Sequence, residues 1–538
     1  MSLPIEQLKT YFNKHPKDPS NKYAYGTAGF RMNATKLDSV AFRVGLLATL
    51  RSIKLQNQTI GVMITASHNP PEDNGVKIVE PMGEMLPQAW EPLATKLANV
   101  DSFDEFIETL KEIIKSEKID LSDNAKGNGN VILARDTRES GPALLSAAVD
   151  GVLALGGSYK DEGELTTPQL HYLTRSSNDK SFGQATETGY YTKLVKTIEE
   201  ILKIWSIEKP LQITVDGANG VGAEKLENIK SSMIQATVIN DQCDKPHMLN
   251  VDCGADYVKT NQKLPAGIST NPVPLKLYSS FDGDADRVVL YYVDQDLKFK
   301  LLDGDKIATL LAGFISGLLN QLKGDVDLKL GIVQTAYANG SSTKFIESTL
   351  NVPVAFTSTG VKHLHHKAQE YDIGVYFEAN GHGTVLFSTN YITKLTNYKP
   401  LNSEETKVQK TLLLLVDLIN QTVGDSISDL FAVLIALAVS KKTPTDWDSQ
   451  YLDLPNKLTK LIVNDRFAFK TTNAERQLLE PVGLQEKIDE TVAKFKNGRS
   501  FVRASGTENA VRVYAEADTK ENCELLNSEV SEWVKKFS

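Results

Sequence analysis

The stretch "SFDGDADRVVLYYV", residues 280–293, places three alternating aspartates directly before an apolar run typical of a buried strand. Asp282, Asp284 and Asp286 can converge on one cation, and carboxylate oxygens are the ligands that Mg²⁺ or Ca²⁺ prefers. An EF-hand is excluded, because the sixth position of the loop is arginine instead of glycine and the twelfth is valine instead of glutamate. A solvated acidic turn is the plain alternative, but three uncompensated carboxylates repel one another. The stretch therefore predicts a metal-binding loop at a strand end.

Outward from this loop, apolar strand-like runs alternate with helical segments over the first four-fifths of the 538 residues. Such alternation predicts α/β units with parallel or mixed sheets, in which ligands gather at the carboxyl ends of the strands. The clearest strand-like runs are "TIGVMIT", "GNVILAR", "LQITVDG", "RVVLYYV", "LGIVQTAY" and "IGVYFEA".

The chain is too long for one hydrophobic core, so several domains are expected. Interruptions of the pattern near 180, 298 and 445 predict domains at 1–180, 181–298, 299–445 and 446–538. The last segment differs in kind, since it combines short strands with two amphipathic helices, "EKIDETVAKFK" and "ENCELLNSEVSEWVKKF". It is expected to form a smaller α+β domain.

Charge and cysteine content limit the partners and the compartment. The formal net charge of -9 argues against a nucleic-acid partner. Three cysteines without a CxxC spacing fit a reducing compartment. The N-terminus has no apolar signal region, and the most apolar stretch, "ISDLFAVLIALAVS", is short and carries Asp429. A cytoplasmic protein without a membrane partner is therefore expected.

A serine follows another predicted strand in "ITASHNPPEDNGVKI", residues 64–78. Ser67 is open to three interpretations: a turn residue, a hydrolase nucleophile or a carrier of a phosphoryl group. The hydrolase interpretation is weak, because the second glycine of a G-x-S-x-G elbow is missing. A phosphorylated Ser67 would supply the extra oxygen ligand that three aspartates need to complete an Mg²⁺ site.

Two further polar turns follow predicted strands. In "GVYFEANGHGTVLF", residues 374–387, Glu378, Asn380 and His382 alternate and can hydrogen-bond sugar hydroxyls, although a plain polar turn fits as well. In "FVRASGTENAVRVY", residues 501–514, small donors lie between two arginines and form a candidate phosphate clamp, with a hairpin turn as the alternative. The candidate clamp residues are Arg503, Ala504, Ser505, Gly506, Thr507 and Arg512.

These four turns, with "YGTAGFR", "LTTPQLHYL", "CGADYVKT" and "QTAYANGSST", resemble the α-D-phosphohexomutases over nearly the whole chain. The match is best with the branch that acts on N-acetylglucosamine phosphates. "ARDTRESG" follows the serine loop here, whereas phosphoglucomutases and phosphomannomutases usually place such a segment before it. Asn380 stands where the glucose and mannose enzymes typically carry serine. One departure is Ala504, where the family more often has a proline.

The resemblance implies four domains around a central cleft, three of them α/β with mixed sheets and the fourth a smaller α+β domain. It implies an isomerase, an intramolecular phosphotransferase that interconverts N-acetylglucosamine 6-phosphate and 1-phosphate through phospho-Ser67 and a 1,6-bisphosphate. That product would feed UDP-N-acetylglucosamine synthesis. Mg²⁺ is the implied cofactor, N-acetylglucosamine or glucose 1,6-bisphosphate the activator, and a monomer the expected state.

The resemblance also implies residue roles. Ser67 and the three aspartates would hold the metal, and Arg31 and Arg287 would neutralise the transferring phosphoryl group. Lys77 and His382 match candidate general bases. The implied sugar-binding residues are Glu378, Ala379, Asn380 and Gly381. The "HLHH" run at 363–366 is interpreted as structural.

Besides the serine hydrolase already considered, two rival interpretations stay open at this point. The same chemistry on glucose or mannose phosphates is the first. A regulatory sugar-phosphate-binding protein that has lost catalysis is the second, although the complete set of serine and aspartates disfavours it.

Overall fold

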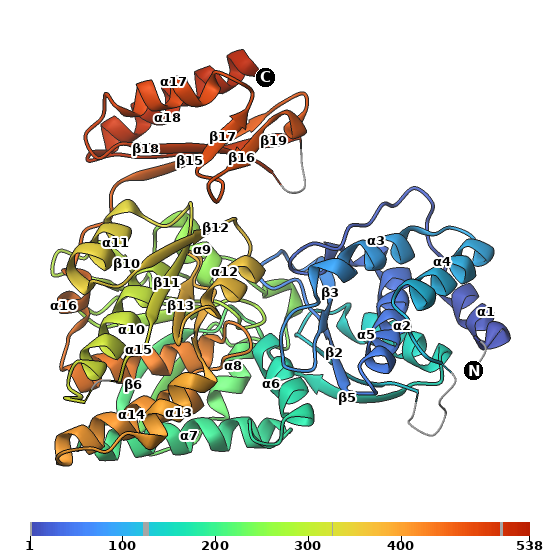
Figure 1. The fold of residues 1–538 in the computed structure, drawn as a ribbon, viewed down its shortest axis with the longest axis horizontal. Helices are drawn as coiled ribbons and strands as arrows, with labels where there is room; N and C mark the ends of the chain where they lie inside the picture. Colours follow the sequence, from blue (N-terminus) through green and yellow to red (C-terminus); the bar gives the residue numbers. More distant parts are fainter. Residues whose placement is uncertain (1–2, 122–127, 325, 506–508) are drawn as a thin grey trace. The chain divides into compact units, whose positions relative to one another are not determined.

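The computed structural model describes residues 3–121, 128–324, 326–505 and 509–538. The chain forms two compact units, and each is described by itself (Figure 1). The first unit comprises Met1–Leu301 together with Asp417–Ile435, and the second comprises Leu302–Val416 together with Ala436–Ser538. A short segment late in the sequence therefore completes the first unit.

The first sheet of the first unit is mixed, with strand order β1-β3-β2-β4-β5. β3 runs antiparallel to β1 and β2, whereas β2, β4 and β5 are parallel. Its strands are β1 (Phe30–Asn33), β2 (Thr59–Ile64), β3 (Asp73–Val79), β4 (Asn130–Arg135) and β5 (Ser158–Glu164). The helices of this part are α1 (Ile5–Lys14), α2 (Asp38–Lys54), α3 (Glu91–Asn99), α4 (Phe103–Ser116), α5 (Gly141–Ala154), α6 (Thr167–Asn178) and α7 (Glu187–Ile204).

The second sheet is also mixed, with order β10-β9-β8-β6-β7. β6 is parallel to β7 and β8, and β8 pairs with β9 antiparallel. Its elements are β6 (Leu211–Asp216), α8 (Val221–Glu227), β7 (Ile234–Ile239), α9 (Ala255–Asn261), β8 (Tyr278–Phe281), β9 (Val288–Val293) and β10 (Phe299–Leu302). Every residue of β8 and β9 is buried, so the turn between them is held by a rigid base.

The second unit holds a third mixed sheet, of order β12-β11-β13-β14, in which only the β13–β14 pair is antiparallel. Its strands are β11 (Leu330–Thr335), β12 (Val354–Thr357), β13 (Ile373–Phe377) and β14 (Gly383–Phe387). The helices between β10 and residue 448 are α10 (Gly304–Leu319), α11 (Gly340–Phe345), α12 (Val361–Ala368), α13 (Thr389–Asn397), α14 (Ser403–Leu418), α15 (Ser426–Ser440) and α16 (Pro444–Asp448). The larger part of α15, up to Ile435, belongs to the first unit.

The fourth sheet is antiparallel, with order β15-β19-β18, and α17 and α18 pack on one of its faces (Figure 1). Its strands are β15 (Asn456–Ile462), β18 (Arg499–Ala504) and β19 (Ala510–Glu516), and the helices are α17 (Leu484–Val492) and α18 (Lys520–Phe537). The hairpin of β16 (Lys470–Thr472) and β17 (Gln477–Glu480) is a separate two-stranded sheet. The prediction of three mixed α/β sheets and a smaller C-terminal α+β part is confirmed. The predicted domain boundaries stay a prediction, and β10 and Asp417–Ile435 are the segments that bear on them.

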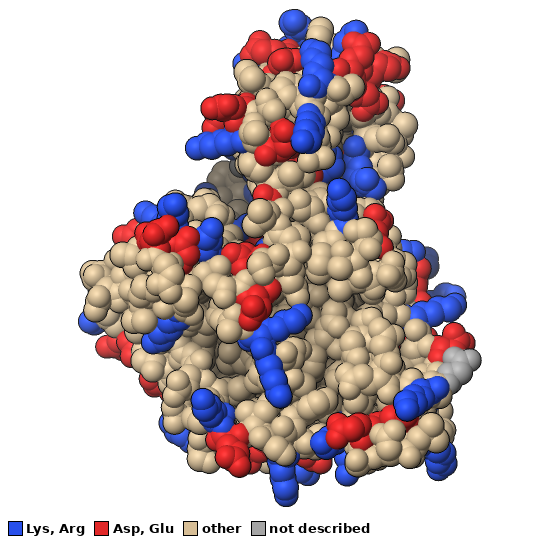
Figure 2. Space-filling view, turned by 90° about the vertical axis from the view of Figure 1, so that its left-hand side faces the viewer, with Lys and Arg blue, Asp and Glu red and all other residues tan. Residues whose placement is uncertain are grey.

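On the face drawn in Figure 2, lysines and arginines lie interspersed with acidic residues and form no continuous basic surface. This distribution agrees with the acidic net charge. Among the described residues, no helix is both long and apolar enough to cross a bilayer.

Candidate active site

The serine loop leaves β2 and presents Ser67 in a backbone conformation that few L-residues adopt. Ser67 has φ +52° and is only 1 % exposed. The Oγ1 of Thr65 accepts its backbone N–H at 2.9 Å, which holds the turn from within. A non-glycine residue in the left-handed region is uncommon and is kept there by its surroundings.

Arg138 supplies most of those surroundings. Its guanidinium is buried and donates to four backbone carbonyls of the serine loop, at distances from 2.5 to 2.9 Å. The accepting carbonyls belong to Ser67, Asn69, Pro70 and Asp73. The side chain of Asn250 donates to the Ser67 carbonyl as well, at 2.9 Å. The loop is therefore fixed by a buried cation and an amide from outside it.

The acidic loop is the turn between β8 and β9. Oδ1 of Asp282 accepts the backbone N–H groups of Asp286 and Arg287, both at 3.0 Å, so this carboxylate closes the turn. Gly283 is required by close approach, because a Cβ there would lie 2.6 Å from the Ser67 carbonyl oxygen. The serine loop and the acidic loop are thus in backbone contact.

The structure brings Ser67 and the three aspartates together. The Oγ of Ser67 donates to Oδ2 of Asp282 at 2.6 Å, with both residues buried. One ligand oxygen from each of Asp282, Asp284 and Asp286 lies within 4.8 Å of the others. Oδ1 of Asp284 is buried and has no hydrogen-bond partner among the described residues. An orphaned oxygen in a ring of hard donors fits a divalent cation such as Mg²⁺.

Electrostatics point the same way. Burial and the neighbouring Asp286 and Asp284 raise the pKa of Asp282 well above its ordinary value. Without a cation, three ionised carboxylates at this spacing destabilise the folded chain. A bound cation would therefore stabilise the cluster of negative charges.

This electrostatic penalty gives a stability prediction. A raised carboxyl pKa in the folded state means that the metal-free protein loses stability as pH rises from the unfolded carboxyl's value through the folded one. We expect MgCl₂ to raise Tm of chelator-treated protein. At a hundredfold excess of Mg²⁺ over its Kd, the free energy of unfolding should rise by about 2.7 kcal/mol. The rise in Tm should be larger at pH 8 than at pH 6. Differential scanning fluorimetry against KCl of equal ionic strength measures this. Equal Tm values in the two salts would contradict it.

Three predicted cationic residues surround the cluster. Lys77 on β3 places Nζ 3.6 Å from Asp284 and 3.8 Å from Asp286. Nε of Arg287 lies 3.8 Å from Oδ2 of Asp282. Arg31 on β1 donates to Asn69 of the serine loop at 3.3 Å, and desolvation by burial lowers the pKa of its guanidinium.

His68, next to the serine, received no role from the sequence. Burial, with Arg287 and Arg31 adding to it, lowers the pKa of His68 to about 3. His68 is therefore neutral at physiological pH and adds no charge to the site.

The predicted sugar loop is the turn between β13 and β14. Oδ1 of Asn380 accepts the backbone N–H of His382 at 3.0 Å, and its Nδ2 lies 3.4 Å from Glu378. Glu378, Ala379 and Asn380 are partly exposed, whereas Gly381 and His382 are buried. In the "HLHH" run on α12, His365 Nδ1 lies 3.0 Å from the Tyr376 hydroxyl, which agrees with a structural role.

The predicted phosphate loop joins β18 to β19, and Gly506 and Thr507 lie outside the described residues. Arg503 and Arg512 stand directly opposite each other on the two strands, and Lys460 on β15 is opposite Arg512. Opposed residues share one sheet face, and like charges there repel. A row of three cations across the sheet therefore favours an anionic ligand. Glu475 already lies 3.4 Å from Arg503.

The sequence did not single out Arg138, Asn250 or Lys460. "ARDTRESG" had marked the region of Arg138 only as a family motif, and a lone asparagine or lysine carries no signal of its own. Their roles appear only in the contacts that folding makes.

Comparison with known proteins agrees with this geometry. Family models match along the chain: phosphoglucomutase/phosphomannomutase alpha/beta/alpha domain I at 44–104 and 107–183, and its C-terminal domain at 458–532. Between them, phosphoacetylglucosamine mutase AMG1 domain II matches 180–289 and domain III matches 303–442.

Fold and site together define an α-D-phosphohexomutase. A curated phosphoacetylglucosamine mutase of Candida albicans is 56 % identical over 99 % of this chain and 100 % of its own length. The chain belongs to the phosphoacetylglucosamine mutase family.

Two solved structures have nearly the same fold. An N-acetylglucosamine-phosphate mutase in its substrate complex has a TM-score of 0.95 at 56 % identity, covering 99 % of this chain and 100 % of its own. The Aspergillus fumigatus N-acetylphosphoglucosamine mutase in complex with GlcNAc-6P and magnesium has a TM-score of 0.94 at 44 % identity, covering 100 % and 99 %.

Proposed function

We propose that the chain interconverts N-acetylglucosamine 6-phosphate and N-acetylglucosamine 1-phosphate by passing a phosphoryl group through Ser67. The observation that carries the proposal is the buried 2.6 Å contact between Ser67 Oγ and Asp282 inside a three-carboxylate cluster. A turn serine needs no such cluster, and a hydrolase serine needs a basic partner in place of a carboxylate ring.

The reaction runs as two transfers. The P–O bond to Ser67 Oγ breaks as a new bond forms to O1 or O6 of the sugar phosphate. The hydroxyl proton passes to Lys77 or His382 as general base, and the freed Ser67 oxygen takes up a proton from that group to become a hydroxyl again. The resulting 1,6-bisphosphate reverses its orientation and returns its other phosphoryl group to Ser67. Arg31 and Arg287 stabilise the charge on the transferring oxygens. A divalent cation held by the three aspartates supplies further charge neutralisation when bound.

The proposal also names the metal, the activator, the phosphate-binding residues and the cellular compartment. Mg²⁺ is the proposed metal, and a hexose 1,6-bisphosphate the proposed activator, because a chain that has lost its phosphoryl group needs one to restart. Arg503, Ser505 and Arg512 hold the phosphate that does not react. The proposed setting is the cytoplasm, because three free cysteines fit a reducing compartment. A monomeric state and a supply of product to UDP-N-acetylglucosamine synthesis complete the proposal.

The decisive test is sugar selectivity. We expect kcat/KM on N-acetylglucosamine 6-phosphate to exceed that on glucose 6-phosphate, measured with Mg²⁺ and a trace of hexose 1,6-bisphosphate. A tenfold preference for glucose, about 1.4 kcal/mol in barrier, would assign the chain to the glucose branch instead. Absence of turnover on either sugar, in a chain that binds both, would support the regulatory alternative.

Asn380 provides a residue-level prediction. We propose that the side-chain amide of Asn380 bonds the acetamido group of the sugar. Asn380→Ser removes that amide, so we expect kcat/KM for N-acetylglucosamine 6-phosphate to fall about tenfold while that for glucose 6-phosphate changes little. Asn390→Ser is the matched control, because Asn390 lies on α13 and bonds only to Asp372 in the described structure. An equal loss on both sugars would mean that Asn380 only shapes its loop.

A further inference from the structure

The acidic loop is hydrogen-bonded by a side chain that the proposed mechanism does not use. Thr167 opens α6, and its Oγ1 donates to Oδ2 of Asp284 at 2.6 Å. Its backbone N–H donates to the carbonyl of the same aspartate at 3.1 Å. Thr167 and Asp284 are both fully buried, so no water competes for these bonds.

We propose that Thr167 is a positioning residue for the metal cluster, selecting which oxygen of Asp284 is left for the cation. Of the two carboxylate oxygens, Oδ2 is engaged by Thr167 and has Lys77 at 3.6 Å. Oδ1 is buried and has no partner among the described residues. Removing the threonine hydroxyl frees the carboxylate to rotate, and an unordered ligand binds metal less well. The proposal rests on the metal dependence of the proposed function.

Thr167 itself is rigidly placed. The preceding Thr166 and Gln169 form a reciprocal capping box, with two hydrogen bonds of 3.1 Å, and Pro168 stands in the first turn. Such a box fixes the start of a helix. The capping box therefore fixes the position of the Thr167 hydroxyl.

Two other helix starts hold the neighbouring carbonyls of the acidic loop. Val221, the first residue of α8, donates its N–H to Gly283 at 3.2 Å, and Ser426, the first residue of α15, donates to Ala285 at 3.1 Å. With Thr167, three consecutive carbonyls of the loop accept from three helix N-termini. The positive ends of those helices also oppose the charge of the carboxylates. Of these three helix starts, Thr167 alone adds a side-chain bond to a carboxylate oxygen of the cluster.

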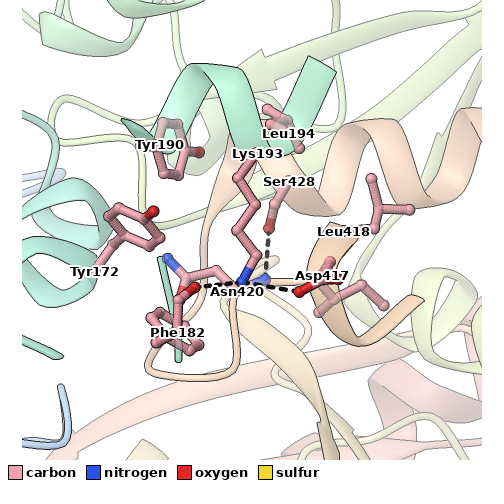
Figure 3. Close-up of a pocket in the computed structure, with 10 residues that line it drawn as sticks. Tyr172, Phe182, Tyr190, Lys193, Leu194, Asp417, Leu418, Asn420 and Ser428 are labelled. Atoms are coloured by element: carbon pink, nitrogen blue, oxygen red, sulfur yellow. Dashed lines mark hydrogen bonds and ion pairs between the residues drawn. The ribbon is translucent and has the colours of Figure 1, made fainter. Parts of the chain in front are cut away.

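The segment that precedes α15 is bonded to α6 and α7 in turn. The side chain of Asn420 donates to the Pro168 carbonyl at 3.3 Å, and Tyr190 donates to Asp425 at 2.9 Å. Figure 3 shows the pocket that Tyr190 and Asn420 line, in which Lys193 pairs with Asp417 at 3.1 Å. Residues of α6, α7 and the segment before α15 thus support the acidic loop from behind, and Thr167 is the one whose side chain bonds a carboxylate of the metal cluster.

The test is metal affinity of the chelator-treated full chain, measured by Mn²⁺ titration calorimetry and separately as the Mg²⁺ concentration for half-maximal activity. We expect Thr167→Val to weaken Mn²⁺ binding about tenfold or more, within the range seen when an outer partner of a ligand is lost. Thr167→Ser keeps the hydroxyl and should recover most of that affinity. The KM for sugar phosphate should stay within about threefold, which separates the effect from general damage.

Thr174→Val is the matched control, because Thr174 is buried on the same helix and its hydroxyl donates only to the Leu170 carbonyl in the described structure. If Thr167→Val does not fold, Thr167→Ala and Thr174→Ala replace the pair. Wild-type Mn²⁺ affinity in a folded Thr167→Val or Thr167→Ala protein would overturn the proposal. So would an equal loss in the Thr167 and Thr174 variants. Failure of the proposed function shows up differently, as wild-type protein that binds Mn²⁺ without turning over N-acetylglucosamine phosphates.

Discussion

Ser67→Ala is expected to abolish turnover of N-acetylglucosamine 6-phosphate, with kcat falling about 10⁴-fold or more, as in enzymes that lose a covalent nucleophile. The alanine retains the shape of the loop, because Arg138 and Asn250 hold the backbone of residue 67 through its carbonyl. Substrate binding should therefore persist while chemistry stops. Intact-mass measurement of the purified wild type should show one phosphate group, which is missing from the variant.

Ser177→Ala is the control, since Ser177 lies on α6 and its hydroxyl bonds only to the Leu173 carbonyl in the described structure. It should keep both activity and phosphate. A phosphate group that remains on Ser67→Ala, or undiminished turnover, would remove Ser67 from the mechanism. Labelling of Ser67 by a fluorophosphonate in the presence of chelator would revive the hydrolase interpretation.

Asp282→Asn is expected to lower kcat about 10³-fold, because it removes one negative charge from the metal cluster and the acceptor of the Ser67 hydroxyl. Its effect on stability should have the opposite sign. Since burial and two carboxylates raise the pKa of Asp282, its ionised form destabilises the metal-free fold at neutral pH. The asparagine still accepts the two backbone N–H groups of the turn. Without metal, the variant should be as stable as wild type or more so.

The diagnostic result is a large fall in kcat without any loss of stability in the metal-free protein. Tm in chelator should rise or stay level, and the increase produced by Mg²⁺ should shrink. Asp296→Asn is the control, because Asp296 is an exposed residue in the next hairpin. If Asp282→Asn lost stability in chelator, the carboxylate would be a structural element of the turn and the metal role would fail.

Much of the fold was predictable because buried strands leave a short and nearly continuous apolar run in the sequence. "TIGVMIT" became β2, "LQITVDG" became β6 and "RVVLYYV" became β9. The position of Asp417–Ile435 was not predictable. Its apolar helix shows that it is buried, but hydrophobic periodicity does not say against which partner.

The candidate site was also predictable only in part. Ser67 and the three aspartates were predicted because their residue types carry chemistry at recognisable spacings. Thr167 and Arg138 were missed because a threonine at a helix start or an arginine after a strand is ordinary in any sequence. Their importance lies in backbone carbonyls and a carboxylate contributed by segments far away in the chain.

The late return of Asp417–Ile435 to the first unit affects how the chain is made. The N–H of Ser426 that holds Ala285 leaves the ribosome on the order of ten seconds after Ala285 itself, at ordinary rates of synthesis. The residues of the acidic turn are therefore synthesised long before Ser426, the last residue that supports the turn. Metal loading is expected to be completed only after Ser426 has left the ribosome, and chains cut short before that residue should remain unable to bind metal tightly.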